Sequence, residues 1–393
     1  MEKRVYFDWA ASAYGNPSSQ HKEGHSAKNA LENARERCAK VLNVPPQTLY
    51  FTSGGTESNS IALFSNLRRP GKGRIIASAG EHSSVREGME TLERMGKPTG
   101  CIAIDSAGRV TEEFLLKALN KYGDVRFVTA LSVNNETGSI TDIASLTNVT
   151  RKYSSGSAPI HFHCDLVQAI GKIPADIEKL DIDSASLSAH KLGGPRGIGL
   201  LYLKKPIEVF YTGGGQENGI RGGTENTDGA LAFADCLEKY AFLMRNVECG
   251  ITNGKSVNSV ECGVTSGKSV EERYVLAKGR WKRLIDSLLG IERCRIIPGC
   301  RSSGDDSFSP FILQAAFKDI PGEVMARALD DLGFAVSTGS ACSSSSPERP
   351  VLMAMGVEEN LRIEGIRISQ GHETTDEDIE LLLGAIKEVL KFL

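Results

Sequence analysis

The fold is decided by a nearly continuous apolar stretch, Val125-Arg126-Phe127-Val128-Thr129-Ala130-Leu131-Ser132-Val133. A run of this length is typical of a β-strand, and its lack of strict alternation indicates that both of its faces are covered. Polar residues, Asn134-Asn135-Glu136, follow it at once. The stretch therefore predicts a central strand that ends in a polar loop.

On either side of this stretch, short apolar runs alternate with longer helical patterns. The runs are at residues 49–53, 74–78, 159–164, 182–188 and 198–203, with helical patterns at 57–67 and 83–95 between them. This alternation predicts an α/β fold with a mainly parallel sheet between helices. Such sheets bind ligands at the carboxyl ends of their strands. Polar loops follow four of the runs there, and they carry Ser53-Gly54-Gly55-Thr56, Asn134-Asn135-Glu136, Asp165 and His190-Lys191. We therefore expect one site at this edge.

The second half of the chain has a different organisation. It is helical after about residue 226, and residues 247–257 are then nearly repeated as residues 260–270. A helix at 271–289, a strand near 311–313 and helices at 321–332 and 375–393 indicate a smaller α+β unit. We expect a large domain at 15–245, an inserted duplicated segment at 246–270, and a small domain at 271–393 that also includes residues 1–14.

Composition excludes several classes of protein. The 393 residues carry a net charge of −3 and show no basic stripe or nucleic-acid motif, so no nucleic acid is expected. No signal segment begins the chain and no apolar run is long enough to span a membrane, so the cytoplasm is expected. The nine cysteines are scattered without a CxxC pair. They predict neither a disulfide framework nor a metal site.

Lys191 and Asp165 are the first candidates for chemistry. Lys191 lies among glycines after a strand, where a poorly solvated amine could act as a nucleophile or hold a cofactor. Asp165 ends an apolar strand, where a carboxylate could keep the ring nitrogen of pyridoxal phosphate protonated. Taken singly, each has an ordinary alternative, a solvated surface lysine and a turn aspartate.

Gly54-Gly55-Thr56 and His82 are further candidates. The glycines precede a helix, whose first N–H groups and positive dipole end suit a phosphate, although an ordinary helix cap has the same pattern. His82 follows a strand and could stack on a cofactor ring or move protons. Taken alone, His82 does not identify a function.

Cys342 and Arg367 lie in the second half. Cys342 belongs to a small, polar stretch at 337–346, where we expect an exposed, reactive thiolate, with a stray surface thiol as the alternative. Arg367 lies within an apolar strand, where it needs an anionic partner. A substrate carboxylate would serve, and so would a structural ion pair.

Taken together, these residues resemble the cysteine desulfurases, the NifS/IscS-like members of the class V aminotransferase superfamily. The resemblance covers about residues 5–378. The matching motifs, in the family's order, are Tyr6-Phe7-Asp8-Trp9-Ala10-Ala11, Thr52-Ser53-Gly54-Gly55-Thr56-Glu57, Glu81-His82, Val133-Asn134-Asn135-Glu136-Thr137-Gly138, Asp165-Leu166-Val167-Gln168, Ser188-Ala189-His190-Lys191, Gly213-Gly214-Gly215-Gln216-Glu217, Arg221-Gly222-Gly223-Thr224-Glu225-Asn226, Ser340-Ala341-Cys342 and Ile366-Arg367-Ile368-Ser369. The resemblance implies a fold-type I architecture, with a seven-stranded sheet and a smaller α+β domain.

The resemblance also implies a role for each matching residue. Lys191 would hold pyridoxal 5'-phosphate as a Schiff base, Asp165 would pair with the ring nitrogen, and His82 would stack on the ring and transfer protons. The other residues expected at the cofactor are Gly55, Thr56, Asn135, Gln168, Ser188, His190 and, from the second subunit of a homodimer, Thr224. Asn135 and Arg367 would bind the carboxylate of L-cysteine. Cys342 would take the substrate sulfur as a persulfide and leave L-alanine.

Alternatives remain at this point. A selenocysteine lyase would share the cofactor and most of the site. Transamination needs no thiol, and an inert sulfur-carrier subunit would not need Lys191, Asp165 and His82 together. The sulfur acceptor, such as an iron–sulfur scaffold protein or a tRNA-thiolating system, is left open by the sequence, as are the need for an activator protein and the role of residues 247–270.

Overall fold

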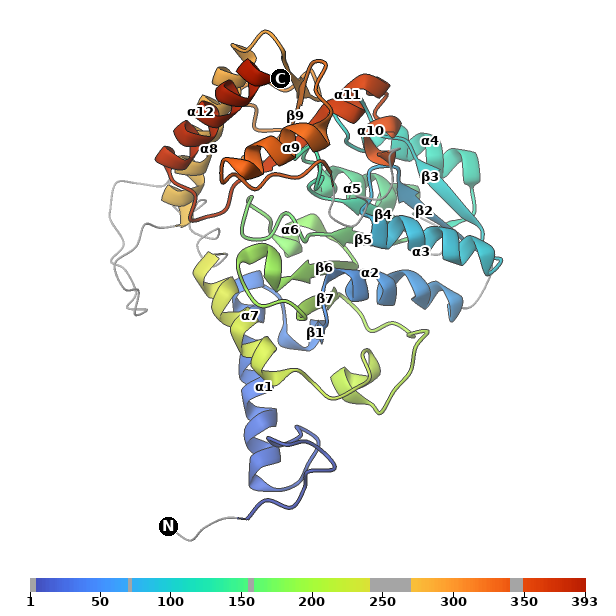
Figure 1. The fold of residues 1–393 in the computed structure, drawn as a ribbon. Helices are drawn as coiled ribbons and strands as arrows, with labels where there is room; N and C mark the ends of the chain where they lie inside the picture. Colours follow the sequence, from blue (N-terminus) through green and yellow to red (C-terminus); the bar gives the residue numbers. More distant parts are fainter. Residues whose placement is uncertain (1–4, 70–72, 155–158, 241–269, 340–348) are drawn as a thin grey trace, which may run out of the picture.

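The computed structural model describes residues 5–69, 73–154, 159–240, 270–339 and 349–393 (Figure 1). Its larger sheet has seven strands in the order β1-β7-β6-β5-β4-β2-β3. The strands are β1 Leu49–Thr52, β2 Arg74–Ser78, β3 Thr99–Ile102, β4 Val125–Leu131, β5 His161–Asp165, β6 Ser184–Ser188 and β7 Gly199–Leu203. The pairs from β3 to β6 are parallel, and β7 is antiparallel to both of its neighbours. The predicted mainly parallel sheet is confirmed.

Helices cover both faces of this sheet. They are α1 Lys22–Leu42, α2 Gly55–Phe64, α3 Ser83–Arg94, α4 Glu112–Tyr122, α5 Ile143–Tyr153, α6 Ile177–Leu180 and α7 Thr227–Tyr240. α2 and α3 pack on each other and on strands β2, β5, β6 and β7. α4, α5 and α6 form a contiguous row. From β1 to β3 the chain advances along the sheet toward one edge, and from β3 to β6 it returns. Because crossovers between parallel strands are right-handed, this reversal places α2 and α3 on one face and α4, α5 and α6 on the other.

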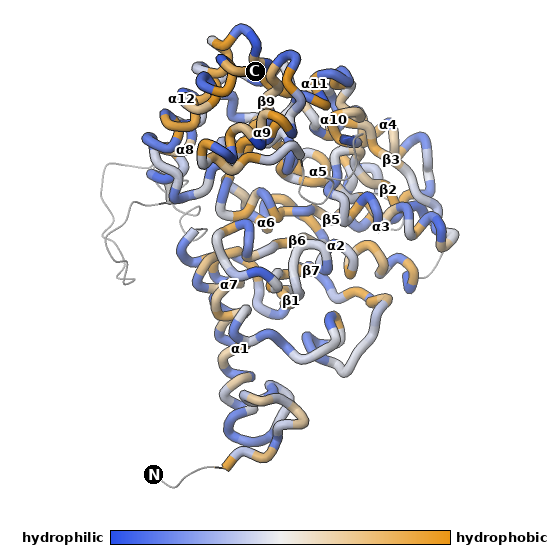
Figure 2. The backbone as a smooth tube through the Cα atoms, in the orientation of Figure 1, coloured by the Kyte–Doolittle hydropathy of each residue, from blue (hydrophilic) through white to orange (hydrophobic). Residues whose placement is uncertain are grey.

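A second, three-stranded antiparallel sheet lies in the C-terminal part, in the order β10-β9-β8. Its strands are β8 Cys294–Ile297, β9 Ile312–Phe317 and β10 Gly365–Ser369, and its helices are α8 Val270–Leu289, α9 Gly322–Asp331, α10 Pro350–Ala354, α11 Glu359–Glu364 and α12 Asp376–Phe392. α8, α9 and α12 build a core of their own with this sheet. Figure 2 shows apolar and polar segments alternating along α8 and α12, as expected of helices with one buried face.

The predicted element limits are close to the observed ones. α12, predicted at 375–393, opens with a capping box in which Thr375 is the N-cap and Asp378 its partner. The helical pattern at 57–67 splits into α2 and a short 3-10 turn at Ser65–Leu67. The duplicated segment falls outside the described residues, apart from Val270 at the start of α8. The domain limits given above stay a prediction.

Two features are absent from the described residues. None of their helices is both long and apolar enough to cross a membrane. In the same part of the chain, no three His, Cys, Asp or Glu side chains gather closely enough to hold a metal ion.

Candidate active site

The predicted site residues that follow strands of the large sheet converge on one edge of it. β2 leads to Glu81-His82, β4 to Asn135, and β5 ends on Asp165. β1 leads into the start of α2, and β6 leads into a short 3-10 turn, Ala189–Leu192, that carries Lys191. The elements therefore bring together side chains that lie up to 135 residues apart in the sequence, as Thr56 and Lys191 do.

Asp165 is held rigidly. Its side chain is buried, with 2% of the residue exposed. The amide Nδ2 of Asn59 on α2 donates to its Oδ2 over 2.9 Å. The backbone N–H of Val167 donates to its Oδ1, also over 2.9 Å. The carboxylate therefore has a fixed orientation, which a partner for a protonated ring nitrogen requires.

His82 caps the start of α3. Its Nδ1 accepts the backbone N–H of Ser84 at 3.2 Å and lies 2.9 Å from the Ser84 hydroxyl. Because Nδ1 serves as an acceptor, a neutral His82 carries its proton on Nε2. Burial lowers the pKa of His82, Asp165 opposes this, and Lys191 lowers it further. These electrostatic contributions link His82 with the two main cofactor candidates.

The start of α2 is shaped to receive a phosphate. Gly54 is its N-cap and provides no side-chain cap, so the first N–H groups of the helix point outward. A Cβ on Gly55 would lie 2.6 Å from Val167, and one on Gly199 would lie 2.5 Å from the Cα of Gly54. Glycine at positions 55 and 199 therefore allows the start of α2 to pack closely against Val167 and β7.

Ser188 and His190 complete this cradle. The Ser188 hydroxyl lies 2.8 Å from His190 Nδ1, and Ser188 is buried while His190 is exposed. Thr56, in the first turn of α2, is also exposed. Thr56 and His82 line one cavity of about 380 Å³, so the helix start and the stacking candidate share one open space.

Gln168 has a partner that the sequence reasoning missed. Lys172 Nζ donates to Gln168 Oε1 over 2.5 Å. Burial lowers the pKa of Lys172 to about 7, and Lys191 and Arg367 add to the effect. Lys172 follows Gln168 by four residues, in the turn after β5.

The two residues predicted to bind the substrate carboxylate are neighbours. Arg367 on β10 donates from Nη1 to the backbone oxygen of Asn135 over 3.1 Å. Burial raises the pKa of the adjacent Glu136, while Arg349 and Arg367 lower it. The small sheet therefore brings a guanidinium to the edge of the large one.

Lys191, Thr224 and Cys342 complete the set of predicted site residues. Lys191 and Thr224 are both exposed. Cys342 lies outside the described residues. Of the other cysteines in the described ranges, Cys38, Cys164 and Cys294 are buried, as free cysteines commonly are.

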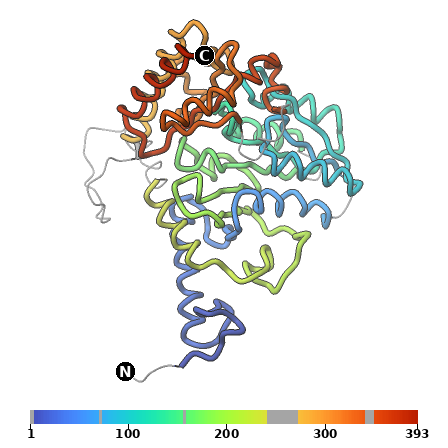
Figure 3. Tube along the Cα trace, viewed as in Figure 1, coloured from blue at the N-terminus to red at the C-terminus, as the bar shows by residue number. Residues whose placement is uncertain are grey.

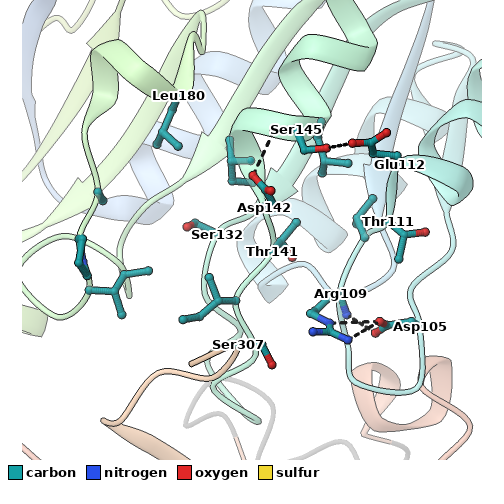
Figure 4. A pocket seen from close by; sticks show the side chains of 17 residues that line it. Asp105, Arg109, Thr111, Glu112, Ser132, Thr141, Asp142, Ser145, Leu180 and Ser307 are labelled. Carbon is teal, nitrogen blue, oxygen red and sulfur yellow. Dashed lines mark hydrogen bonds and ion pairs between the residues drawn. The ribbon is translucent and has the colours of Figure 1, made fainter. Parts of the chain in front are cut away.

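A separate cavity of about 550 Å³ lies behind the loop between β4 and α5 (Figure 4). Its charged side chains have partners, since Arg109 pairs with Asp105 and Glu112 bonds Ser145. Ser132 and Thr141 also line it, but no predicted site residue does. We therefore assign the chemistry to the sheet edge and not to this cavity.

The residues at the sheet edge fit pyridoxal phosphate. The uncapped helix start and the glycine cradle suit its phosphate, and the buried Asp165 suits its ring nitrogen. Lys191 supplies an amine after β6, which lies between β1 and β5 in the order of the sheet.

Comparisons with known proteins agree with this geometry. A family model described as Aminotransferase class-V matches residues 5–247. A cysteine desulfurase IscS of Dictyoglomus turgidum is 34% identical over 416 aligned positions, which cover 100% of this chain and 96% of that protein. A cysteine desulfurase IscS of Vibrio vulnificus is also 34% identical, covering 100% and 89%. Among solved structures, a NifS-like protein superposes with a TM-score of 0.81 at 32% identity, covering 98% of this chain and 94% of the other.

Proposed function

This chain belongs to the aminotransferase class-V family and is a cysteine desulfurase within it, and we propose which of its residues carry the reaction. Membership of this family implies the use of pyridoxal phosphate, which stabilises a carbanion next to the substrate amine when it is bound. The observation that carries the function is similarity over the whole chain to proteins named cysteine desulfurase.

We assign the cofactor to the cluster at the sheet edge. Lys191 would hold it covalently, Asp165 would keep its ring nitrogen protonated, and Gln168 would contact its ring oxygen. Gly55, Thr56, Ser188 and His190 would bind its phosphate. The burial of Asp165 and the uncapped start of α2 support this assignment.

His82 would stack on the ring and move protons through Nε2, because its Nδ1 is occupied by Ser84. Its lowered pKa keeps the imidazole neutral near pH 7. Asn135 and Arg367, which are hydrogen-bonded neighbours, would bind the carboxylate of L-cysteine.

Cys342 would accept the sulfur. Its thiolate attacks the substrate sulfur, the carbon–sulfur bond breaks and a sulfur–sulfur bond forms. The substrate carbon gains the proton that completes L-alanine, and Cys342 becomes a persulfide. L-cysteine and one enzyme thiol are thereby converted to L-alanine and one enzyme persulfide.

Substitution of single cysteines tests this assignment. With a reductant present, the wild-type protein should release sulfide and alanine from L-cysteine, and Cys342→Ala should lose this activity while keeping the cofactor absorbance. Cys300→Ala is the matched control, because Cys300 is an exposed thiol in the same C-terminal part of the sequence. Equal activity of Cys342→Ala and the wild type would remove Cys342 as the acceptor, and L-selenocysteine as the faster substrate would favour a lyase.

We also propose a homodimer in which Thr224 reaches the phosphate of the partner's cofactor. The exposure of Thr224 supports this, since the isolated chain gives it no enclosed environment. The persulfide would pass its outer sulfur to an acceptor such as an iron–sulfur scaffold protein. The cytoplasmic location stays a prediction.

A further inference from the structure

A row of hydrogen-bonded polar side chains runs beneath the candidate site. His161, His163 and Asp165 alternate along β5 and therefore face the same side of the sheet. Ser184 on β6 is paired with His163 in the strand register. α2 covers this side of β5 and β6 and places Asn59 between His163 and Asp165.

The contacts form an unbroken chain. His161 Nε2 lies 2.7 Å from the Ser184 hydroxyl, which lies 2.7 Å from His163 Nδ1. His163 Nε2 lies 2.9 Å from Asn59 Oδ1, and Asn59 Nδ2 lies 2.9 Å from Asp165 Oδ2. The Ser186 hydroxyl, 3.4 Å from His163 Nε2, is a weaker neighbour.

The charge of Asp165 fixes the direction of every bond in this chain. An ionised carboxylate only accepts, so Asn59 must turn its NH₂ group to Asp165 and its oxygen to His163. His163 must then donate from Nε2, which leaves its Nδ1 as an acceptor for the Ser184 hydroxyl. Ser184 in turn accepts the Nε2 proton of His161. All four donors therefore point toward Asp165.

The hydrogen-bonded row is also held rigid, and its two histidines are neutral. The Phe127 ring stacks on His161 at 4.9 Å and on His163 at 6.1 Å between ring centroids. Burial lowers the pKa of both histidines to about 3, so each ring keeps one proton at neutral pH. His163 is 0% exposed, so water does not compete for its bonds.

The same amide reaches the second candidate at the ring. Asn59 Nδ2 also donates to the Ser84 hydroxyl over 2.9 Å, and that hydroxyl lies 2.9 Å from His82 Nδ1. One buried side chain on α2 therefore connects Asp165 with His82.

We propose that Asn59 and His163 are positioning residues that aim the Asp165 carboxylate at the cofactor ring nitrogen and hold it ionised. Ser184 and His161 hold the end of the hydrogen-bonded row that lies away from Asp165. This inference rests on the proposed function, because it assumes pyridoxal phosphate at the sheet edge. Each donor in the row stabilises the negative charge that keeps the ring nitrogen protonated.

The experiment loads the full-length protein with pyridoxal phosphate labelled with ¹⁵N in its ring and records the nitrogen chemical shift, which reports protonation. The variant is His163→Phe, which keeps the stack on Phe127 but removes both hydrogen bonds. We expect its ring-nitrogen signal to move toward the unprotonated position. We expect kcat to fall by roughly tenfold with KM little changed, as when partners behind a functional ligand are removed.

Matched variants separate positioning from packing. His161→Phe removes an equivalent histidine from the same stack, two hydrogen bonds farther from Asp165, and should keep the wild-type nitrogen signal and kcat within about twofold. His163→Gln should recover part of the signal by donating to Asn59. Asn59→Ala tests the same link if His163→Phe fails to fold.

The outcomes are distinct. A His163→Phe or Asn59→Ala protein with the wild-type nitrogen shift and wild-type kcat overturns this inference and leaves the proposed function intact. A wild-type protein that binds no cofactor and releases no sulfide overturns the proposed function itself. Equal changes in His161→Phe and His163→Phe mean that the histidines act through packing alone, and also overturn the inference.

Discussion

Glu81, beside the predicted His82, shows how burial sets the charge of a single residue. It is 3% exposed, and the Thr129 hydroxyl donates to its Oε1 over 2.9 Å. Its Oε2 has no hydrogen-bond partner among the described residues. Burial, with a further contribution from Asp165, raises the pKa of Glu81 to about 8. Glu81 is therefore protonated at pH 7.

This protonation makes stability depend on pH. Between pH 4.5 and 8 the folded protein holds one proton on Glu81 that the unfolded chain releases, so stability falls as the pH rises, by about 1.4 kcal/mol per pH unit. Glu81→Gln removes this cost and can still accept from Thr129. We expect the variant to be more stable than the wild type by roughly 3 kcal/mol at pH 7 and equally stable near pH 4.5.

Urea unfolding at several pH values checks the prediction. Glu93→Gln, at an exposed position of α3, is the control and should show no such trend. A Glu81→Gln protein that is less stable than the wild type at pH 7 would mean that Glu81 is ionised in the fold.

At the scale of elements, one buried ion pair fixes the loop that carries the predicted Thr224. Arg35 on α1 donates to both carboxylate oxygens of Glu217 over 2.8 Å, and the Phe51 N–H on β1 donates to the same carboxylate. Both side chains are nearly fully buried, at 6% and 2% exposure. The pair therefore ties the segment after β7 to α1 and β1, and with it the approach of Thr224 to a partner.

Glu217→Gln should destabilise the protein strongly, because it leaves the buried Arg35 without its main counter-charge. We expect a loss of about 3–5 kcal/mol in the free energy of unfolding, as when one partner of a buried pair is removed. Glu238→Gln is the matched control. It breaks the exposed pair with Arg37 on the same helix and should cost less than about 1 kcal/mol. Denaturant unfolding of both variants shows whether the Arg35–Glu217 pair stabilises this loop or is an incidental contact.

At the scale of the whole molecule, the two ends of the structure differ. Figure 3 shows the C-terminal part gathered at one end, while the N-terminal segment projects from the other. This segment exposes large apolar side chains, with Phe7 92% and Trp9 69% exposed. Exposed aromatic residues in this number are typical of a surface that another protein covers.

We therefore predict that light scattering after size exclusion gives a dimer, with twice the chain mass of 42.3 kDa. Phe7→Ser should shift the protein toward the monomer on dilution, because it removes apolar area from this segment. Leu381→Ser, at a 54% exposed position of α12, is the control and should leave the dimer unchanged. A monomeric wild type at all concentrations would contradict the dimer and the assigned role of Thr224.

Much of this could be read from the sequence. Continuous apolar runs identified six of the seven strands of the large sheet, and the loops after them carried Asp165, His82 and Lys191 to one edge. The edge strand β3 was missed. The runs at 159–164 and 182–188 were interpreted as apolar throughout. Their alternation of His161, His163 and Asp165, and of Ser184, Ser186 and Ser188, was the missed signal of a polar face.

Local pattern and residue identity are enough to predict the alternation of strands and helices and the order of the motifs, and therefore the family. The packing of the folded chain is what places Asn59 between His163 and Asp165, brings Arg35 to Glu217, and buries Glu81 with its Oε2 unpaired among the described residues. Residues 104, 106 and 182 positions apart become partners only when the strands are ordered and the helices packed on them. The protonation of Glu81 and the neutral ring of His163 follow from that burial, because removal from water disfavours the charged form.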